Sequence, residues 1–318
     1  MSTAAKHSVP TPRNLEALAE ENPGILGVSY LSDVFAHEAR VFWGFTWRDW
    51  SMSVIPGMMY TVAALRSLDA LPSDDFPRVA LTRSFIYFVL FIYSMDIANQ
   101  INGYAEDRVD KPDRPIPSGL VSLKGAHIRW YITTGALLAL GAAWGVLRWA
   151  ALWVGITVYT NWCGGNAHWV TKNLLFMSVG SLSIVTAAWG LAAPIGPAEW
   201  RFMLLLSALF GLVASVQDIR DMEGDRAVGR RTLPLVLGAR FRGAMAALIC
   251  AAPPVAWTVR FYDSKNAFVP PCGALLTLAM LYMAYRVLRG RSAAYDHGTY
   301  MLLTYIYCGC VAVPMLFP

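Results

Sequence analysis

Residues 202–226 read FMLLLSALFGLVASVQDIRDMEGDR, an apolar run that ends in a cluster of acidic residues. The apolar part predicts a membrane span, since about 20 mostly apolar residues cross the hydrocarbon core of a bilayer. Similar runs recur along the 318 residues, of which 56% are hydrophobic and only 15% charged. Ordinary soluble domains carry about 25% charged residues. The composition therefore predicts one all-α integral membrane domain.

The apolar runs divide the chain into candidate spans separated by polar loops. We expect about nine transmembrane helices around a central cavity, at residues 43–65, 79–99, 130–147, 149–162, 174–193, 202–216, 243–259, 268–287 and 300–317. Residues 1–42 are expected to form a flexible tail with a possible interfacial helix in its second part. Residues 43–318 would then form the membrane domain.

The basic residues indicate an orientation. The formal charge is +5, and the loops after the second, sixth and eighth expected spans carry more arginines and lysines than the loops on the opposite side. Loops rich in Lys and Arg stay in the cytosol, so the cavity is expected to open on that side. A nucleic-acid-binding protein would instead carry a basic face on a polar body, so we expect no nucleic-acid partner.

The second expected span runs into NQINGYAEDRVDKPDRPIPSG, residues 99–119. If the helix continues past the membrane, Asn99, Gly103 and Asp107 stack on one face. Glu106 lies beside that face and Asp96 lies one turn deeper. The following Ile-Pro-Ser-Gly sequence ends the helix.

The sixth expected span ends in Asp218, Asp221 and Asp225, which are spaced three and four residues apart. On one helix these carboxylates would share a face and repel each other. Two acidic motifs at the ends of two spans suggest a cation between them, and Mg²⁺ takes oxygen ligands together with water and phosphate. Basic residues nearby would bind the remaining phosphate oxygens: Arg108, Lys111, Arg114, Arg220 and Arg226. Lys172 and Asn173, just before the fifth expected span, could also reach a phosphate.

The two motifs resemble those of the UbiA superfamily of membrane prenyltransferases and terpene cyclases. The first continues as Lys111-Pro…Arg114-Pro-Ile-Pro-Ser-Gly119, and the second as Gly-x-Arg-Thr-Leu-Pro234. The resemblance covers nearly the whole chain. It implies Mg²⁺ and an isoprenoid diphosphate between the motifs, with Asp107, Asp221 and Asp225 as catalytic residues. It also implies a set of metal ligands: Asn99, Glu106, Asp107, Asp218, Asp221 and Asp225.

Gly103 departs from the family pattern, which usually has an aspartate there. Glu106 or Asp96 would replace that carboxylate, or phosphate and water would hold the metal. The pattern around residues 99–114 resembles a fungal branch that includes membrane-bound sesquiterpene cyclases. The resemblance therefore implies a cyclase of farnesyl diphosphate in the endoplasmic reticulum.

Two other functions remain open. The first is prenyl transfer to an aromatic acceptor, and the second is non-catalytic binding or transport of polyisoprenoids. In either enzyme an apolar cavity holds the hydrocarbon. Counting back from Asn99 by helical turns predicts that Met95, Ile92 and Phe88 line it while Phe91 faces elsewhere.

Overall fold

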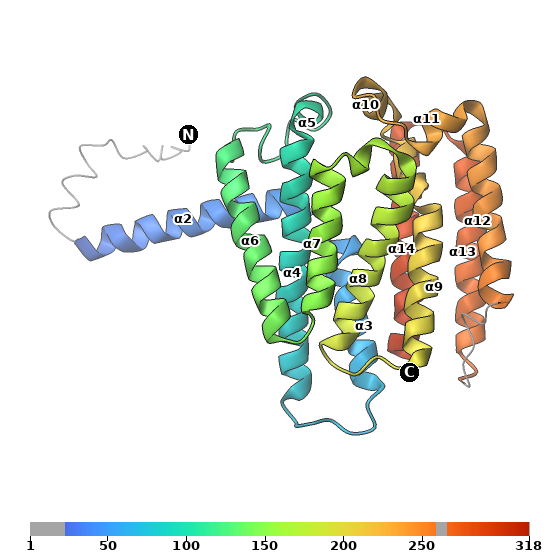
Figure 1. Ribbon diagram of the computed structural model, residues 1–318, viewed down its shortest axis with the longest axis horizontal. Coiled ribbons are helices and arrows are strands. Elements are labelled where there is room, and N and C mark those ends of the chain that lie inside the picture. The colour runs from blue at the N-terminus through green and yellow to red at the C-terminus, as the bar shows by residue number, and fades with distance from the viewer. Residues whose placement is uncertain (1–22, 259–265, 318) are drawn as a thin grey trace, which may run out of the picture. The chain divides into compact units, whose positions relative to one another are not determined.

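The computed structural model describes residues 23–258 and 266–317, and most of these residues are helical (Figure 1). The expected flexible tail at residues 1–22 lies outside the described residues. The all-helical expectation is confirmed by the elements observed: α2 (Pro23–Thr46), η1 (Trp50–Met52), α3 (Val54–Arg66), α4 (Phe76–Asn102), α5 (Tyr104–Asp110), α6 (Leu123–Ala143), α7 (Leu147–Trp162), η2 (Gly165–Ala167), η3 (Val170–Leu175), α8 (Phe176–Gly190), α9 (Pro197–Val213), η4 (Ala214–Ile219), α10 (Met222–Ala227), α11 (Leu233–Leu237), η5 (Gly238–Arg240), α12 (Phe241–Thr258), α13 (Val269–Arg289) and α14 (Ala293–Leu316).

Helix α2 up to Gly44 is separate from a compact unit that begins at Phe45 and contains the other described helices. Within this unit the long helices pack in chain order, from α3 to α4, α6, α7, α8, α9, α12, α13 and α14. Helix α14 packs in turn against α3 and closes the ring. Segments far apart in the sequence are thereby brought to one interior.

Six helical segments among the described residues are long and apolar enough to cross a membrane. They are Phe76–Asn102, Val170–Gly190, Pro197–Ile219, Leu233–Thr258, Val269–Arg289 and Ala293–Leu316. This indicates an integral membrane protein. The expected number of nine spans is not confirmed, because α3, α6 and α7 do not meet these limits of length and composition.

The first expected span, residues 43–65, is wrong as a single helix. Helix α2 ends at Thr46, a turn and η1 follow, and α3 begins only at Val54 and has 13 residues. The break contains Asp49 and Ser53, and such side chains compete with the helical backbone for hydrogen bonds. The break turns this polar segment toward the interior of the ring.

Both acidic motifs also interrupt their helices, which corrects the expectation of continuous helical faces. Helix α4 ends at Asn102, Gly103 follows as its C-cap, and the seven-residue α5 begins at Tyr104. The second motif runs through the 3-10 segment η4, a turn at Asp221 and the short α10. Asp218, Asp221 and Asp225 therefore do not share one α-helical face, although the fold still brings them to the same cavity.

Candidate functional site

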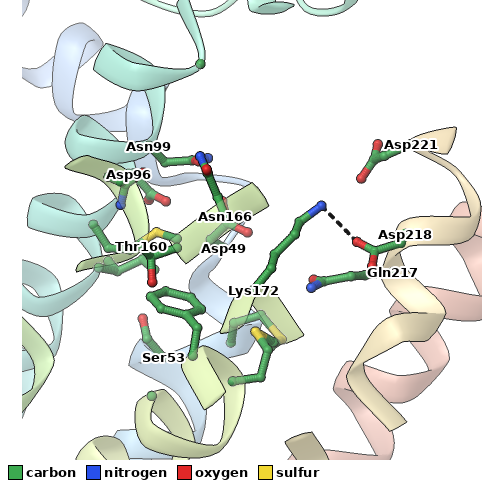
Figure 2. A pocket seen from close by; sticks show the side chains of 18 of the residues that line it. Asp49, Ser53, Asp96, Asn99, Thr160, Asn166, Lys172, Gln217, Asp218 and Asp221 are labelled. Carbon is green, nitrogen blue, oxygen red and sulfur yellow. Dashed lines mark ion pairs between the residues drawn. The ribbon is translucent and has the colours of Figure 1, made fainter. Parts of the chain in front are cut away.

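A cavity inside the ring has a polar part between the two acidic motifs and an apolar part among the long helices. Residues of α4, α5, η4 and α10 line the polar part. Figure 2 shows Asn99 and Asp96 on one wall, with Asp218 and Asp221 on the other. The convergence of the two motifs that the sequence suggests is thus present in the fold.

The first wall carries Asp107 of α5, which is 2% exposed. Its two carboxylate oxygens accept hydrogen bonds from Nη1 of Arg114 at 2.7 and 2.6 Å. Asn99, Gly103 and Glu106 line the cavity beside it. A buried carboxylate needs such a charged partner, because desolvation of an isolated charge is costly.

The second wall carries Asp218 and Asp225, whose side chains are fully buried. Nζ of Lys172 lies 2.9 Å from Asp218 and 3.3 Å from Asp225 (Figure 2 marks the first pair). Asn173 donates from Nδ2 to Asp218 and, at 3.0 Å, to Oγ of Ser215. Lys172 therefore pairs with two carboxylates at once, and Asn173 holds one of them in place.

Asp221 is the most accessible of the three aspartates in the second motif, with 28% of its side chain exposed. Its Oδ2 lies 3.3 Å from Nε of Arg220. The guanidinium of Arg220 also covers the ring of Tyr300 at 4.3 Å from the centroid. This stacking fixes the arginine beside the cavity that all three residues line.

Arg230 connects the two motifs. Its Nη1 lies 2.8 Å from Glu106 on the first wall and 3.0 Å from Asp225 on the second. Burial works against the guanidinium charge, but the carboxylates of Glu106 and Asp225 outweigh it and raise the pKa of Arg230. The residue is therefore a permanent cation between the acidic motifs.

The apolar part of the cavity is rich in aromatic rings. Phe91 of α4 stacks on Trp153 of α7 with ring centroids 4.0 Å apart and planes at 8°. On the α9 and α14 side, the rings of Phe210 and Tyr307 lie 4.6 Å apart. Phe176 lines the same space next to Trp153. Aromatic faces attract cations, so this part of the cavity suits a positively charged hydrocarbon.

Most of the predicted site residues line this cavity: Ile92, Met95, Asn99, Glu106, Asp107, Lys111, Arg114, Lys172, Asp218, Arg220, Asp221 and Asp225. Three predicted phosphate-binding residues lie elsewhere. Arg108 and Arg226 are exposed, and Arg108 lies over the ring of Tyr104. Asn173 is fully buried behind Asp218.

The predicted places of Phe88 and Phe91 are wrong and must be exchanged. Phe91 lines the cavity, whereas the ring of Phe88 packs against α3, where a Cβ at Gly57 would overlap it. The helical count from Asn99 is sound near the motif. Phe88 lies eleven residues before Asn99, about 16 Å along the helix. At that depth the same face of α4 contacts α3 at Gly57 instead of the cavity.

Sequence reasoning gave Asp49, Arg230 and Tyr300 no role in the site, and it left Ser53 and Thr160 out entirely. All five line the cavity. Asp49 and Ser53 lie in the break between two helices, and Thr160 lies on α7, so only the packing of distant segments reveals them. A charged residue inside an apolar region, such as Asp49, was the one available signal.

Comparisons with known proteins agree with this arrangement. Residues 53–306 match the UbiA prenyltransferase family. The diterpene cyclase eriG of Hericium erinaceus is 36% identical over 278 residues, which cover 86% of this chain and 87% of that protein. The polyprenyl transferase eriF of the same fungus is 34% identical over 280 residues, covering 86% and 93%.

A solved structure shares the fold. It is a UbiA homologue from Archaeoglobus fulgidus bound to GPP and Mg²⁺, and it superposes with a TM-score of 0.60 at 15% identity. The superposition covers 86% of this chain and 98% of that chain. The family match over 53–306, the relatives above 30% identity and the shared fold lead to one conclusion. The chain belongs to the UbiA prenyltransferase family.

Proposed function

We propose that this protein ionises an allylic isoprenoid diphosphate with the help of Mg²⁺ and cyclises the resulting cation. The observation that carries the proposal is the two-part cavity: acidic and basic side chains at one end, and stacked aromatic rings at the other. The first part suits a metal-bound diphosphate, and the second suits a carbocation.

The polar part fits Mg²⁺ by its chemistry. Its oxygen donors would come from both walls: Asn99, Glu106, Asp107, Asp218, Asp221 and Asp225. Among the described residues no group of three or more His, Cys, Asp or Glu side chains is placed to hold a metal ion. Mg²⁺ commonly binds one or two carboxylates and completes its shell with water and substrate phosphates. When bound, it would neutralise charge on the departing diphosphate.

The basic side chains of the cavity bind and orient the substrate. Lys172 and Arg230 line the cavity and are paired with carboxylates. Their side chains could turn from these carboxylates to phosphate oxygens by small movements. Arg114 and Arg220 flank the same space from the two walls. Arginine suits this role because its planar donors match phosphate geometry.

The aromatic part favours cyclisation. An allylic cation formed at the polar end lies next to the Phe91–Trp153 stack, where its own double bonds can reach it before water does. Farnesyl diphosphate, which would give a sesquiterpene, is the proposed substrate. The likeness to a diterpene cyclase makes geranylgeranyl diphosphate the second substrate to test.

Prenyl transfer to an aromatic acceptor is the alternative, and the likeness to a polyprenyl transferase supports it. Non-catalytic binding or transport of polyisoprenoids is a third function. The protein is further proposed to reside in the endoplasmic reticulum with the cavity open to the cytosol. The positive charge of the motif loops supports that orientation.

One assay distinguishes these functions. The purified protein in lipid nanodiscs is incubated with Mg²⁺ and either diphosphate, with and without a phenolic acceptor, and the extract is analysed by mass spectrometry. Cyclic hydrocarbon without acceptor is the expected product. Product that requires the acceptor would establish transfer instead, and saturable binding without diphosphate release would establish a carrier.

A further inference from the structure

A second acidic pair faces the cavity outside the two motifs. Asp49, in the break before α3, and Asp96, on α4, both line the cavity, and their carboxyl groups are hydrogen-bonded to each other. Asp96 is only 4% exposed. Two carboxylates in such contact cannot both be ionised without strong repulsion, so the pair carries at most one negative charge and shares a proton.

Buried hydroxyl groups accompany this pair on the same wall. Ser53 is 1% exposed and Thr160 is 6% exposed, and both line the cavity. Within the described part of the chain, neither Oγ of Ser53 nor Oγ1 of Thr160 has a hydrogen-bond partner. Figure 2 shows both residues with Asp49 and Asp96, across the cavity from Asp218 and Asp221. Unpaired buried hydroxyls are costly, which indicates that they serve a molecule in the cavity.

Arginines surround the acidic pair. The guanidinium groups of Arg114 and Arg220 partly offset the cost of burying negative charge at Asp49. The preceding residue, Arg48, donates from Nη2 to Asp113 at 2.6 Å, which ties the segment before α3 to the loop after α5. On α4, Asp96 lies between Phe91 and Asn99 in the sequence, and all three line the cavity. The pair therefore lies next to residues of both the aromatic part and the first acidic motif.

We propose that the Asp49–Asp96 pair is the base that takes the proton ending the reaction, with the hydroxyl oxygens of Ser53 and Thr160 turned toward the cation. This inference rests on the proposed cyclase function. A C–H bond next to the cationic carbon breaks, its electrons form the final double bond, and the proton moves to the free carboxylate oxygen of the pair. The pair then carries two protons and no charge, and it returns one proton to water after the product leaves.

The test separates ionisation from proton loss. Wild-type protein and Asp49→Asn are compared in nanodiscs with Mg²⁺ and farnesyl or geranylgeranyl diphosphate, and both released diphosphate and the hydrocarbon products are quantified. Asp49→Asn should still release diphosphate at a rate near that of the wild type. Its main cyclic olefin should fall by roughly tenfold or more relative to alcohols and early-quenched alkenes, since positioned bases contribute about 10²–10⁴-fold. Asp49→Glu, which keeps a carboxylate, should restore part of the olefin.

Asp75→Asn is the matched control, because Asp75 pairs with Arg78 in an exposed ion pair at the start of α4. It should match the wild type in both measurements. An unchanged product ratio in Asp49→Asn overturns the inference. So does loss of diphosphate release in Asp49→Asn of normal thermal stability, because that would place Asp49 in the ionising site. A wild-type protein that releases no diphosphate would instead contradict the proposed function itself.

Discussion

Nη1 of Arg230 lies 2.8 Å from Oε2 of Glu106, an ion pair that joins the segment after α10 to α5. The same nitrogen lies 3.0 Å from Asp225. The two acidic motifs, more than 100 residues apart in the sequence, are thus connected through one cation. In the proposed function, a metal–diphosphate complex between the motifs would displace this pairing, and the carboxylate of Glu106 would then be available to the metal.

Glu106 tests which group replaces the carboxylate missing at Gly103. Glu106→Ala should raise the Mg²⁺ concentration for half-maximal turnover by roughly tenfold or more, since altered metal shells typically cost about 10–100-fold. Gly103→Asp in that background should recover part of the loss, because a Cβ at position 103 points within 3.7 Å of Oδ2 of Asp107. An unchanged Mg²⁺ titration in Glu106→Ala would exclude Glu106 from the metal site.

Alanine substitution at Asp221 should differ in its effect on stability from alanine substitution at Asp218 or Asp225. All three variants should lose turnover by at least about 10- to 100-fold. Asp221→Ala should keep its thermal stability, because its side chain is partly exposed. Asp218→Ala and Asp225→Ala should also unfold more easily, because each leaves Lys172 with one buried partner fewer. Turnover together with thermal unfolding checks this, and near-normal turnover in all three variants would refute the metal site.

Lys172 gives a test that does not depend on turnover. Lys172→Met leaves the buried carboxylate of Asp218 without its cation and leaves Asp225 with Arg230 alone, and breaking a buried pair costs about 3–5 kcal/mol. The variant should unfold at a lower temperature without Mg²⁺, and Mg²⁺ should raise its unfolding temperature more than that of the wild type. Differential scanning fluorimetry with and without Mg²⁺ measures both. An equal Mg²⁺ effect in the two proteins would show that the metal does not bind beside Asp218 and Asp225.

Much of the polar site follows from the sequence. Asn99 and Asp107 end one apolar run and Asp218 ends another, and all three line the same cavity even though neither motif is one continuous helix. Local patterns carry this information, because the charges interrupt apolar segments at fixed positions.

The deeper residues depend on packing that local patterns do not contain. Asp49 reaches Asp96 only because the chain breaks between α2 and α3. Phe88 leaves the cavity because Gly57 lets α3 approach α4 closely. Such contacts depend on how the side chains of two helices fit together. Counting helical turns along one helix cannot predict them.

The exchanged places of Phe88 and Phe91 predict opposite results for two matched substitutions. Phe91→Leu removes a ring that lines the cavity and stacks on Trp153, so the cation loses an aromatic face worth about 0.5–2 kcal/mol. The ratio of cyclic to early-quenched product should fall by roughly 2- to 30-fold. Phe88→Leu removes the same group from the contact with Gly57, so it should lower the unfolding temperature and leave the product pattern unchanged. Product analysis and thermal unfolding of both variants provide the measurement. If Phe88→Leu changed the products while Phe91→Leu did not, the cavity face of α4 would be the one predicted by the helical count from Asn99.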